Sequence, residues 1–242
     1  MSRPTALVLT GPGTNRDRDA VLALDLAGAD ATTVAVGELA RRPELIDTAR
    51  ILVIAGGFSY GDALGAGRLL ALDLTSAGGG RLGQQLRDFV DAGRPIVGIC
   101  NGFQVLTRAG LLPGALGHNE QGRFDCRWVE LAPEPHSRCI WTAGAGDEIH
   151  CPIAHGEGRY VHPDPAGLAA NGQVALRYRG GNPNGSVADI AGVCDETGLV
   201  LGLMPHPENH VVARQHPRYQ SDPDTTVHLG LRLFEAAVRH VK

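Results

Sequence analysis

The chain has 242 residues, of which 43% are hydrophobic and 20% charged, a composition typical of one globular domain with a sizeable buried core. Its formal net charge of -4 gives no basic field for a polyanion, so nucleic acid is not expected as a partner. No run of apolar residues is long enough to predict a membrane span, and the five widely spaced cysteines favour a reducing compartment, so we expect a cytoplasmic protein. The last residue, Lys242, is the only lysine, which excludes a lysine-bearing phosphate loop or a Schiff base within the chain.

The first half of the chain alternates short apolar runs with helical spacing, which predicts a parallel sheet covered by helices on both faces. The predicted strands are residues 6–10, 33–36, 51–55 and 95–99, and the predicted helices are residues 19–27, 82–92 and 103–109. A glycine-rich surface loop is expected at residues 77–80.

The second half contains apolar runs joined by Gly, Pro and Asn turns without long helices, which indicates an antiparallel or mixed extension of the same sheet. The predicted strands are residues 127–131, 174–178, 187–193 and 199–204, and a helix over residues 226–241 closes the chain. We therefore expect an α/β fold with a mostly parallel central sheet, flanking helices and an antiparallel extension, organised as a single domain over residues 1–242.

A cysteine stands between a predicted buried strand and a predicted helix, in residues 98–104 (GICNGFQ). The glycines two positions before and after Cys100 permit a tight strand-turn-helix elbow that presents the sulfur at the carboxyl end of the sheet. The start of a helix favours a thiolate nucleophile there, and the backbone N–H of Asn101 would face a developing oxyanion. A buried structural cysteine is the commoner fate of a cysteine taken alone, but the flanking glycines favour the nucleophile.

A base for this thiolate is predicted in residues 204–208 (MPHPE), which follow an apolar strand. His206 and Glu208 are two residues apart in an extended segment fixed by two prolines, so their side chains can point the same way. The carboxylate would orient the imidazole and stabilise its cation, which completes a Cys/His/Glu triad with Cys100. The alternative is a histidine that only ends a strand in a proline-rich turn.

Together, these two segments resemble the signature of class I glutamine amidotransferases. Four segments are similar, more narrowly, to the amidotransferase of phosphoribosylformylglycinamidine synthase: residues 56–62 (GGFSYGD), 152–159 (PIAHGEGR), 182–186 (NPNGS) and 202–208 (GLMPHPE). The matches follow the order of the family from about the first strand onward, so the resemblance covers most of the chain. It implies the flavodoxin-like fold of class I glutamine amidotransferases.

The resemblance also implies a role for each matching residue. Cys100 would be the nucleophile, His206 the general base and acid, and Glu208 the residue that orients the histidine. The further residues implied are Gly57 and Asn101 for the oxyanion hole, and Gly56, Phe58, Gln104 and His155 for binding of the substrate glutamine.

Two other segments allow competing interpretations. His155 and Glu157 could be taken for an acid-base or metal pair, and Glu157 could compete with Glu208, but their glycine-rich surroundings predict a loop at residues 154–158 near the glutamine pocket or a partner interface. Neither residue stands in a CxxC or HxxxH spacing, so no metal site is expected. Residues 11–15 (GPGTN) lack the GK[ST] ending of a phosphate loop and are interpreted as structural or interface-forming.

The activity that the resemblance implies is hydrolysis of L-glutamine to glutamate and ammonia through a thioester on Cys100. The ammonia would pass to an ATP-dependent synthetase subunit (PurL in this family) that forms formylglycinamidine ribonucleotide in purine biosynthesis, with a small bridging subunit (PurS) as a possible third component. ATP and Mg²⁺ would then be used by the synthetase, and this chain would need no cofactor. Two alternatives stay open: an amidotransferase or glutaminase that serves another acceptor, and a non-catalytic binding module on the same fold.

Overall fold

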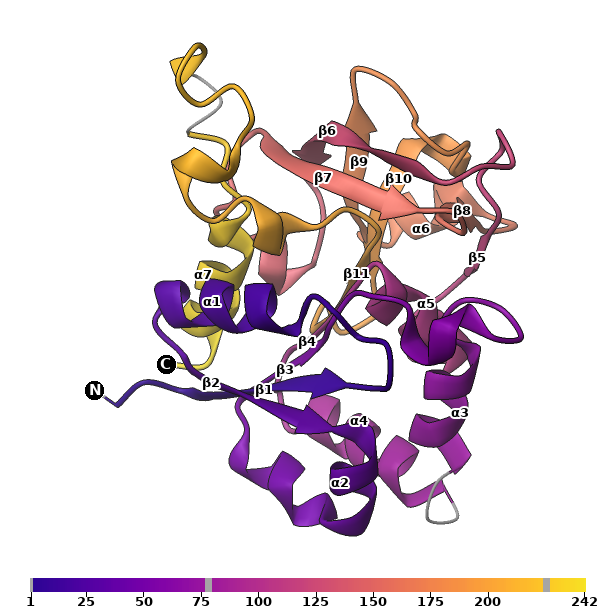
Figure 1. Cartoon of the computed structure of the whole chain (residues 1–242), viewed down its shortest axis with the longest axis vertical. Coiled ribbons are helices and arrows are strands. Elements are labelled where there is room, and N and C mark those ends of the chain that lie inside the picture. Colours follow the sequence, from indigo (N-terminus) through magenta and orange to yellow (C-terminus); the bar gives the residue numbers. More distant parts are fainter. Residues whose placement is uncertain (1, 77–79, 224–226) are drawn as a thin grey trace.

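The computed structural model describes residues 2–76, 80–223 and 227–242 (Figure 1). Within these residues, nine strands form one sheet in the order β2-β1-β3-β4-β11-β10-β9-β6-β7. The strands from β2 to β11 in that order pair in parallel, and those from β11 to β7 pair antiparallel. The strand bounds are β1 Thr5–Thr10, β2 Asp30–Ala35, β3 Ile51–Ile54, β4 Ile96–Ile99, β6 Asp125–Pro133, β7 Ile149–His155, β9 Val174–Arg179, β10 Ile190–Cys194 and β11 Val200–Leu203, and the short strands β5 Ala115–Gly117 and β8 Arg159–Val161 pair separately.

Helices cover the parallel part of the sheet on both faces. α1 (Asp17–Ala27) and α7 (Leu231–His240) lie side by side on one face, and α3 (Arg68–Ser76), α4 (Arg81–Asp91) and α5 (Asn101–Arg108) lie on the other (Figure 1). The short helices α2 (Val36–Arg41) and α6 (Pro165–Ala170) complete the set. The predicted mostly parallel sheet with flanking helices and an antiparallel extension is confirmed. None of the helices in the described part of the chain is long and apolar enough to cross a membrane.

The central strands position the functional residues. β3, β4 and β11 are buried at every position, as expected for parallel strands covered on both faces. They pair side by side in the order β3-β4-β11, so their carboxyl ends meet at one edge of the sheet. Gly57, Cys100 and His206 follow these three ends within a few residues, and the fold therefore brings them together.

Two predicted boundaries at the end of the chain and in the second half are wrong. Residues 227–230 are not helical, because the backbone there bonds elsewhere: the carbonyl of His228 accepts from the N–H of His150 (2.9 Å) and the N–H of Gly230 donates to the carbonyl of His210 (2.8 Å). The predicted helix start at Thr226, and residues 77–79 of the predicted loop, lie outside the described residues. Residues 187–189, predicted as strand, form a 3-10 turn with positive φ at two positions.

The predicted loop at residues 154–158 is also partly wrong, because Ala154 and His155 are the end of β7. β7 lies at the edge of the sheet and pairs with β6 alone, and an edge strand tolerates a proline such as Pro152 because its N–H side needs no strand partner. Only residues 156–158 form the expected turn, between β7 and β8.

Candidate active site

Cys100 occupies the elbow between β4 and α5, and its backbone has a φ of 52° and a ψ of -104°, a conformation that non-glycine residues rarely adopt. Both flanking positions need glycine, because a side chain at either one would clash with neighbouring backbone atoms. A Cβ at Gly98 would lie 2.4 Å from the carbonyl oxygen of Gly102, and a Cβ at Gly102 would lie 2.0 Å from that of Ile54. The glycines therefore let α5 begin directly against β3 and β4, with Cys100 at its N-terminus.

Cys100 lines two adjoining cavities of about 170 and 230 Å³ and therefore lies at their junction. Cys100 is 5% exposed, and its Sγ donates a hydrogen bond to the backbone carbonyl of Ala154 on β7 (3.8 Å). The smaller cavity is also lined by His206, and the larger by Gln104, His155 and Glu157. Residues that line both are Gly57, Phe58, Cys100, Phe124 and Ala154. The thiol therefore has a base, His206, at the smaller cavity, and the larger cavity has room for a small polar substrate.

His206 and Glu208 form a buried pair beside this junction. Nδ1 of His206 lies 2.7 Å from Oε1 of Glu208, which is fully buried. Burial lowers the pKa of His206, but the Glu208 carboxylate and the sulfur of Cys100 outweigh this effect and raise the pKa to about 10. The imidazole is therefore held with a proton on Nδ1 toward the carboxylate, and its charged form is stabilised next to the thiol.

The position of His206 is fixed by its backbone and by a neighbouring glycine. Its N–H donates to the carbonyl of Pro152 on β7 (2.8 Å). A Cβ at Gly56 would lie 2.8 Å from Cε1 of the imidazole, so a residue without a side chain is needed there. Gly56, predicted as a substrate-binding residue, thus lies against the imidazole.

The two residues predicted for the oxyanion hole are both close to Cys100, since Asn101 follows it in the chain and Gly57 lines the same cavities. Gly57 has a φ of 142° and lines both cavities, and a Cβ there would meet the backbone N of Asn15 at 2.7 Å. The side chain of Asn101 is buried and already bonded, since Oδ1 accepts from the N–H of Ser59 (3.3 Å) and Nδ2 donates to Oε1 of Gln104 (3.0 Å). Only the backbone N–H of Asn101, at the start of α5, is therefore suited to an oxyanion.

Gln104 and Phe58 contribute to the larger cavity in different ways. Oε1 of Gln104 is held by Asn101, and Nε2 donates to the carbonyl of Glu157 (2.6 Å), so both ends of this amide are bonded within the protein. Its geometry suits a residue that fixes the turn after β7 rather than one that binds substrate through its own polar atoms. Phe58 is 42% exposed and lies next to Phe124, with ring centroids 6.2 Å apart, and the two rings form an apolar wall of both cavities.

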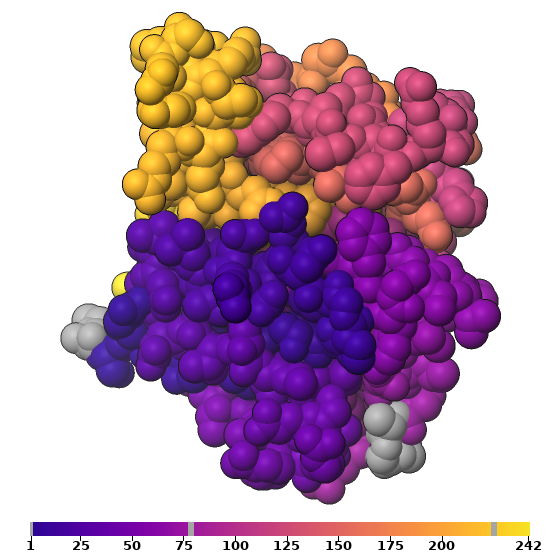
Figure 2. Space-filling view, in the orientation of Figure 1, coloured from indigo at the N-terminus to yellow at the C-terminus, as the bar shows by residue number. Residues whose placement is uncertain are grey.

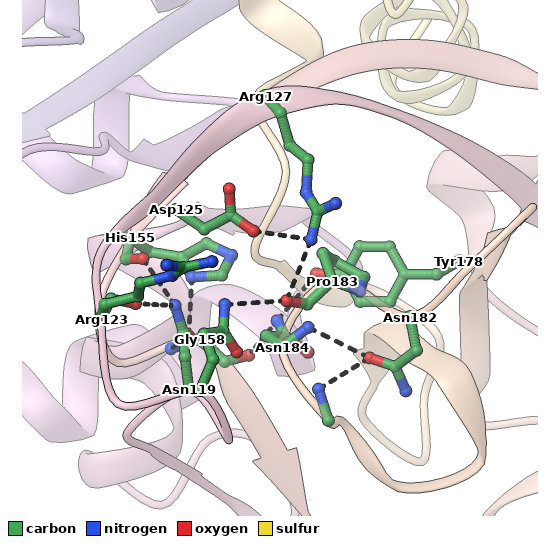
Figure 3. Close-up of polar contacts among 12 residues, drawn as sticks. Asn119, Arg123, Asp125, Arg127, His155, Gly158, Tyr178, Asn182, Pro183 and Asn184 are labelled. Atoms are coloured by element: carbon green, nitrogen blue, oxygen red, sulfur yellow. Dashed lines mark hydrogen bonds and ion pairs between the residues drawn. The ribbon is translucent and has the colours of Figure 1, made fainter.

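His155 is buried, and its contacts with Asn119 (Figure 3) define its tautomer. Nδ2 of Asn119 donates to the carbonyls of Arg123 (3.0 Å) and His155 (2.8 Å), which fixes Oδ1 of Asn119 as the acceptor opposite Nδ1 of His155 (3.0 Å). Nε2 is consequently a hydrogen-bond acceptor, and it is buried with no partner among the described residues. Burial, followed by the nearby His206, lowers the pKa of His155 to about 4, so the ring is neutral. A Cβ at Gly158 would lie 2.2 Å from this ring.

Glu157, the alternative to Glu208 as partner of the histidine, makes contacts with other residues. Its Oε2 accepts from the N–H of Ala66 (3.4 Å) and lies 3.8 Å from Nη2 of Arg108. Sequence reasoning also missed Asn119, which holds His155, because no motif marks this residue and its role arises only when β7 folds against residues 119–123.

Comparison with known proteins places these features in a family. A family model described as a CobB/CobQ-like glutamine amidotransferase domain matches residues 3–241. The chain is 44% identical to phosphoribosylformylglycinamidine synthase subunit PurQ of Treponema denticola, over 99% of both chains, and 42% identical to that of Nostoc sp., over 97% of this chain and 96% of the relative.

Solved structures give the same result. The structure of PurLQS from Thermotoga maritima contains a chain with a TM-score of 0.80 and 36% identity, covering 99% of this chain and all of that one. A putative GMP synthase subunit of Thermoplasma acidophilum, at 14% identity and a TM-score of 0.60, shares the fold. The chain therefore belongs to the glutamine amidotransferases and, within them, to the family of phosphoribosylformylglycinamidine synthase PurQ subunits.

Proposed function

We propose that this chain is the glutaminase subunit of a phosphoribosylformylglycinamidine synthase and that Cys100, His206 and Glu208 carry out its reaction. The observation that supports this most directly is the position of the Cys100 elbow, at the junction of two cavities and next to the buried His206–Glu208 pair. A binding module on the same fold would have no need for a strained cysteine, an oriented imidazole and a buried carboxylate at one point.

In the proposed reaction, Sγ of Cys100 attacks the side-chain amide carbon of L-glutamine, and His206 holds the thiol proton. The carbonyl oxygen becomes an oxyanion that accepts hydrogen bonds from the backbone N–H groups of Gly57 and Asn101. The C–N bond then breaks, and ammonia leaves with the proton from His206. Water, deprotonated by His206, attacks the resulting thioester, which releases glutamate and restores the thiol. Glu208 keeps the imidazole oriented and stabilises its cation in both halves of the reaction.

We assign the larger cavity to the substrate glutamine. His155 offers an unpartnered Nε2 acceptor and a neutral ring, which suits an N–H group of the substrate. Phe58 would cover the aliphatic part of the substrate, while Gln104 would hold the carbonyl of Glu157 in place.

The partners follow from the family. The Thermotoga maritima relative is part of a structure described as PurLQS, and we propose that this chain likewise assembles with a PurL synthetase and a PurS subunit. The ammonia would pass to PurL, which would use ATP and Mg²⁺ to form formylglycinamidine ribonucleotide in purine biosynthesis. The lack of an internal lysine for a phosphate loop supports this division of labour, and the odd number of scattered cysteines supports a cytoplasmic location.

The test measures glutamate released from glutamine by wild type, Cys100→Ala and Cys126→Ala, each with and without the PurL and PurS subunits. Cys126 is exposed and serves as the matched control for loss of a thiol. We expect wild type and Cys126→Ala to release glutamate and to support formylglycinamidine ribonucleotide formation with the synthetase, and Cys100→Ala to do neither. Equal turnover by Cys100→Ala and wild type would exclude the assignment, and glutaminase activity that never couples to this synthetase would favour another acceptor.

A further inference from the structure

Four histidines that the proposed reaction does not use form a cluster near the start of β7. It consists of His150 at the start of β7 and of His210, His216 and His228 in the segment that follows Glu208, and Glu148 lies beside it. Figure 1 shows this segment, in gold, next to the start of β7. In Figure 2 the same gold segment adjoins the pink surface of the antiparallel strands.

Two histidines of the cluster and Glu148 have atoms that could bind a metal ion close to one another. One atom from each of Glu148, His150 and His228 lies within 4.8 Å of the other two. Nε2 of His150 is 2.5 Å from Oε1 of Glu148, and the rings of His150 and His228 have centroids 4.7 Å apart. Ligand atoms around a tetrahedral zinc ion are about 3.4 Å apart. Because Glu148 and His228 are only partly buried, small rotations of their side chains would reach that spacing.

The surroundings of these three residues hold them in place. The N–H of His150 donates to the carbonyl of His228 (2.9 Å), which ties the two ligand-bearing segments together. Nη1 of Arg179 bonds the other oxygen of Glu148 (3.3 Å), so Oε1 is turned toward His150. Trp128 packs against His210 and His216 with centroids 5.2 and 4.4 Å away and closes one side of the cluster.

His210 is a neighbouring histidine of the cluster that also has an unused ring nitrogen. It is fully buried, and its Nδ1 donates to the carbonyl of His150 (2.6 Å). This leaves Nε2 buried and without a partner among the described residues. An imidazole that donates one nitrogen to a backbone carbonyl and leaves the other free has the arrangement typical of a metal-binding histidine.

We propose that Glu148, His150 and His228 bind one divalent transition-metal ion of the zinc class. The ion would replace the proton between His150 and Glu148, and its fourth position would be left for water. Two imidazoles and one carboxylate are ligands that Zn²⁺ and Co²⁺ both accept. The bound ion would tie the segment after Glu208 to β7; that segment begins three residues after His206, and β7 ends at His155. The sequence predicted no metal site because the ligands come from distant segments without a metal-binding spacing.

The experiment uses the full chain with Cys100→Ala and Cys126→Ser, so that the active-site thiol and the exposed thiol cannot bind metal, and its result does not depend on glutaminase activity. Zn²⁺ affinity is measured by competition with a chromogenic chelator, and the coordination by the visible spectrum of the Co²⁺ form. We expect one equivalent bound, a tetrahedral Co²⁺ spectrum without thiolate charge transfer, and a loss of affinity of about tenfold or more in both Glu148→Gln and His228→Gln.

The matched control is His136→Gln, since His136 is an exposed histidine that is not part of the cluster. Thermal unfolding without metal checks that each variant is folded. If His228→Gln and Glu148→Gln bind Zn²⁺ as tightly as His136→Gln does, or if the background protein binds no Zn²⁺ at micromolar concentration, the proposal is wrong and the cluster is a structural ion pair with stacked rings.

Discussion

Replacement of Gly102 by alanine tests whether close packing of α5 on β3 creates the elbow. The added Cβ would lie 2.0 Å from the carbonyl oxygen of Ile54, and ordinary contact begins at 3.4 Å, so the helix and the strand must separate by about 1.4 Å. Overpacking of this kind costs about 1–3 kcal/mol. In a chain of this size, each kcal/mol lowers Tm by about 2–4 °C. We therefore expect Tm to fall by about 2–12 °C.

The same displacement moves Cys100 and the N–H of Asn101 away from Gly57. A misplacement of about 1 Å can cost a reaction about 100-fold, so glutamate release should fall by about that factor at temperatures where the variant remains folded. Circular dichroism melting and a coupled glutamate assay measure the two effects. Gly117→Ala on β5 is the control, because a Cβ there meets nothing within 4 Å. If Gly102→Ala has the same Tm and activity as Gly117→Ala, packing of the glycines does not position the nucleophile.

Two further variants test the electrostatics of the site. The pKa of His206 is raised from 6.5 to about 10 in the folded protein, so its contribution to stability is present below pH 6.5 and is lost as pH rises through 10. Glu208→Gln should flatten this decline in urea unfolding and reduce glutamate release by about 10²–10⁴-fold; an unchanged slope would contradict the pairing. The pKa of His155 is lowered to about 4, so wild type should lose stability as pH falls from 6.5 toward 4. His155→Gln should lessen that acid loss and raise the KM for glutamine by about tenfold with a smaller change in kcat, and an unchanged KM would remove His155 from substrate binding.

The parts of the site that the sequence could predict are those made by short local segments. Gly98 and Gly102 indicate the elbow because the steric need for glycine arises within one strand-turn-helix unit. His206 and Glu208 are two residues apart, so their pairing follows from an extended backbone.

The parts that could not be predicted depend on pairing between distant segments. β7 is a strand because β6 pairs with it, although the glycine-rich surroundings of residues 154–158 predicted a loop. The role of Asn119 depends on its contact with His155, 36 residues later, and a lone asparagine carries no signal of such a contact. The histidine cluster likewise exists only because residues 227–230 bond to β7 and His210 instead of extending α7.

The most direct test of the central claim is labelling with a glutamine analogue that carries an electrophile on its side chain, followed by mass spectrometry of the peptides. Among the five cysteines, Cys126 is exposed, whereas Cys100 is 5% exposed, so simple accessibility favours Cys126. Our account predicts a single label on Cys100 that excess glutamine prevents and that His206→Ala abolishes. Labelling of Cys126 alone, or labelling of Cys100 that glutamine does not prevent, would contradict the assignment of Cys100 as the nucleophile of a glutamine site.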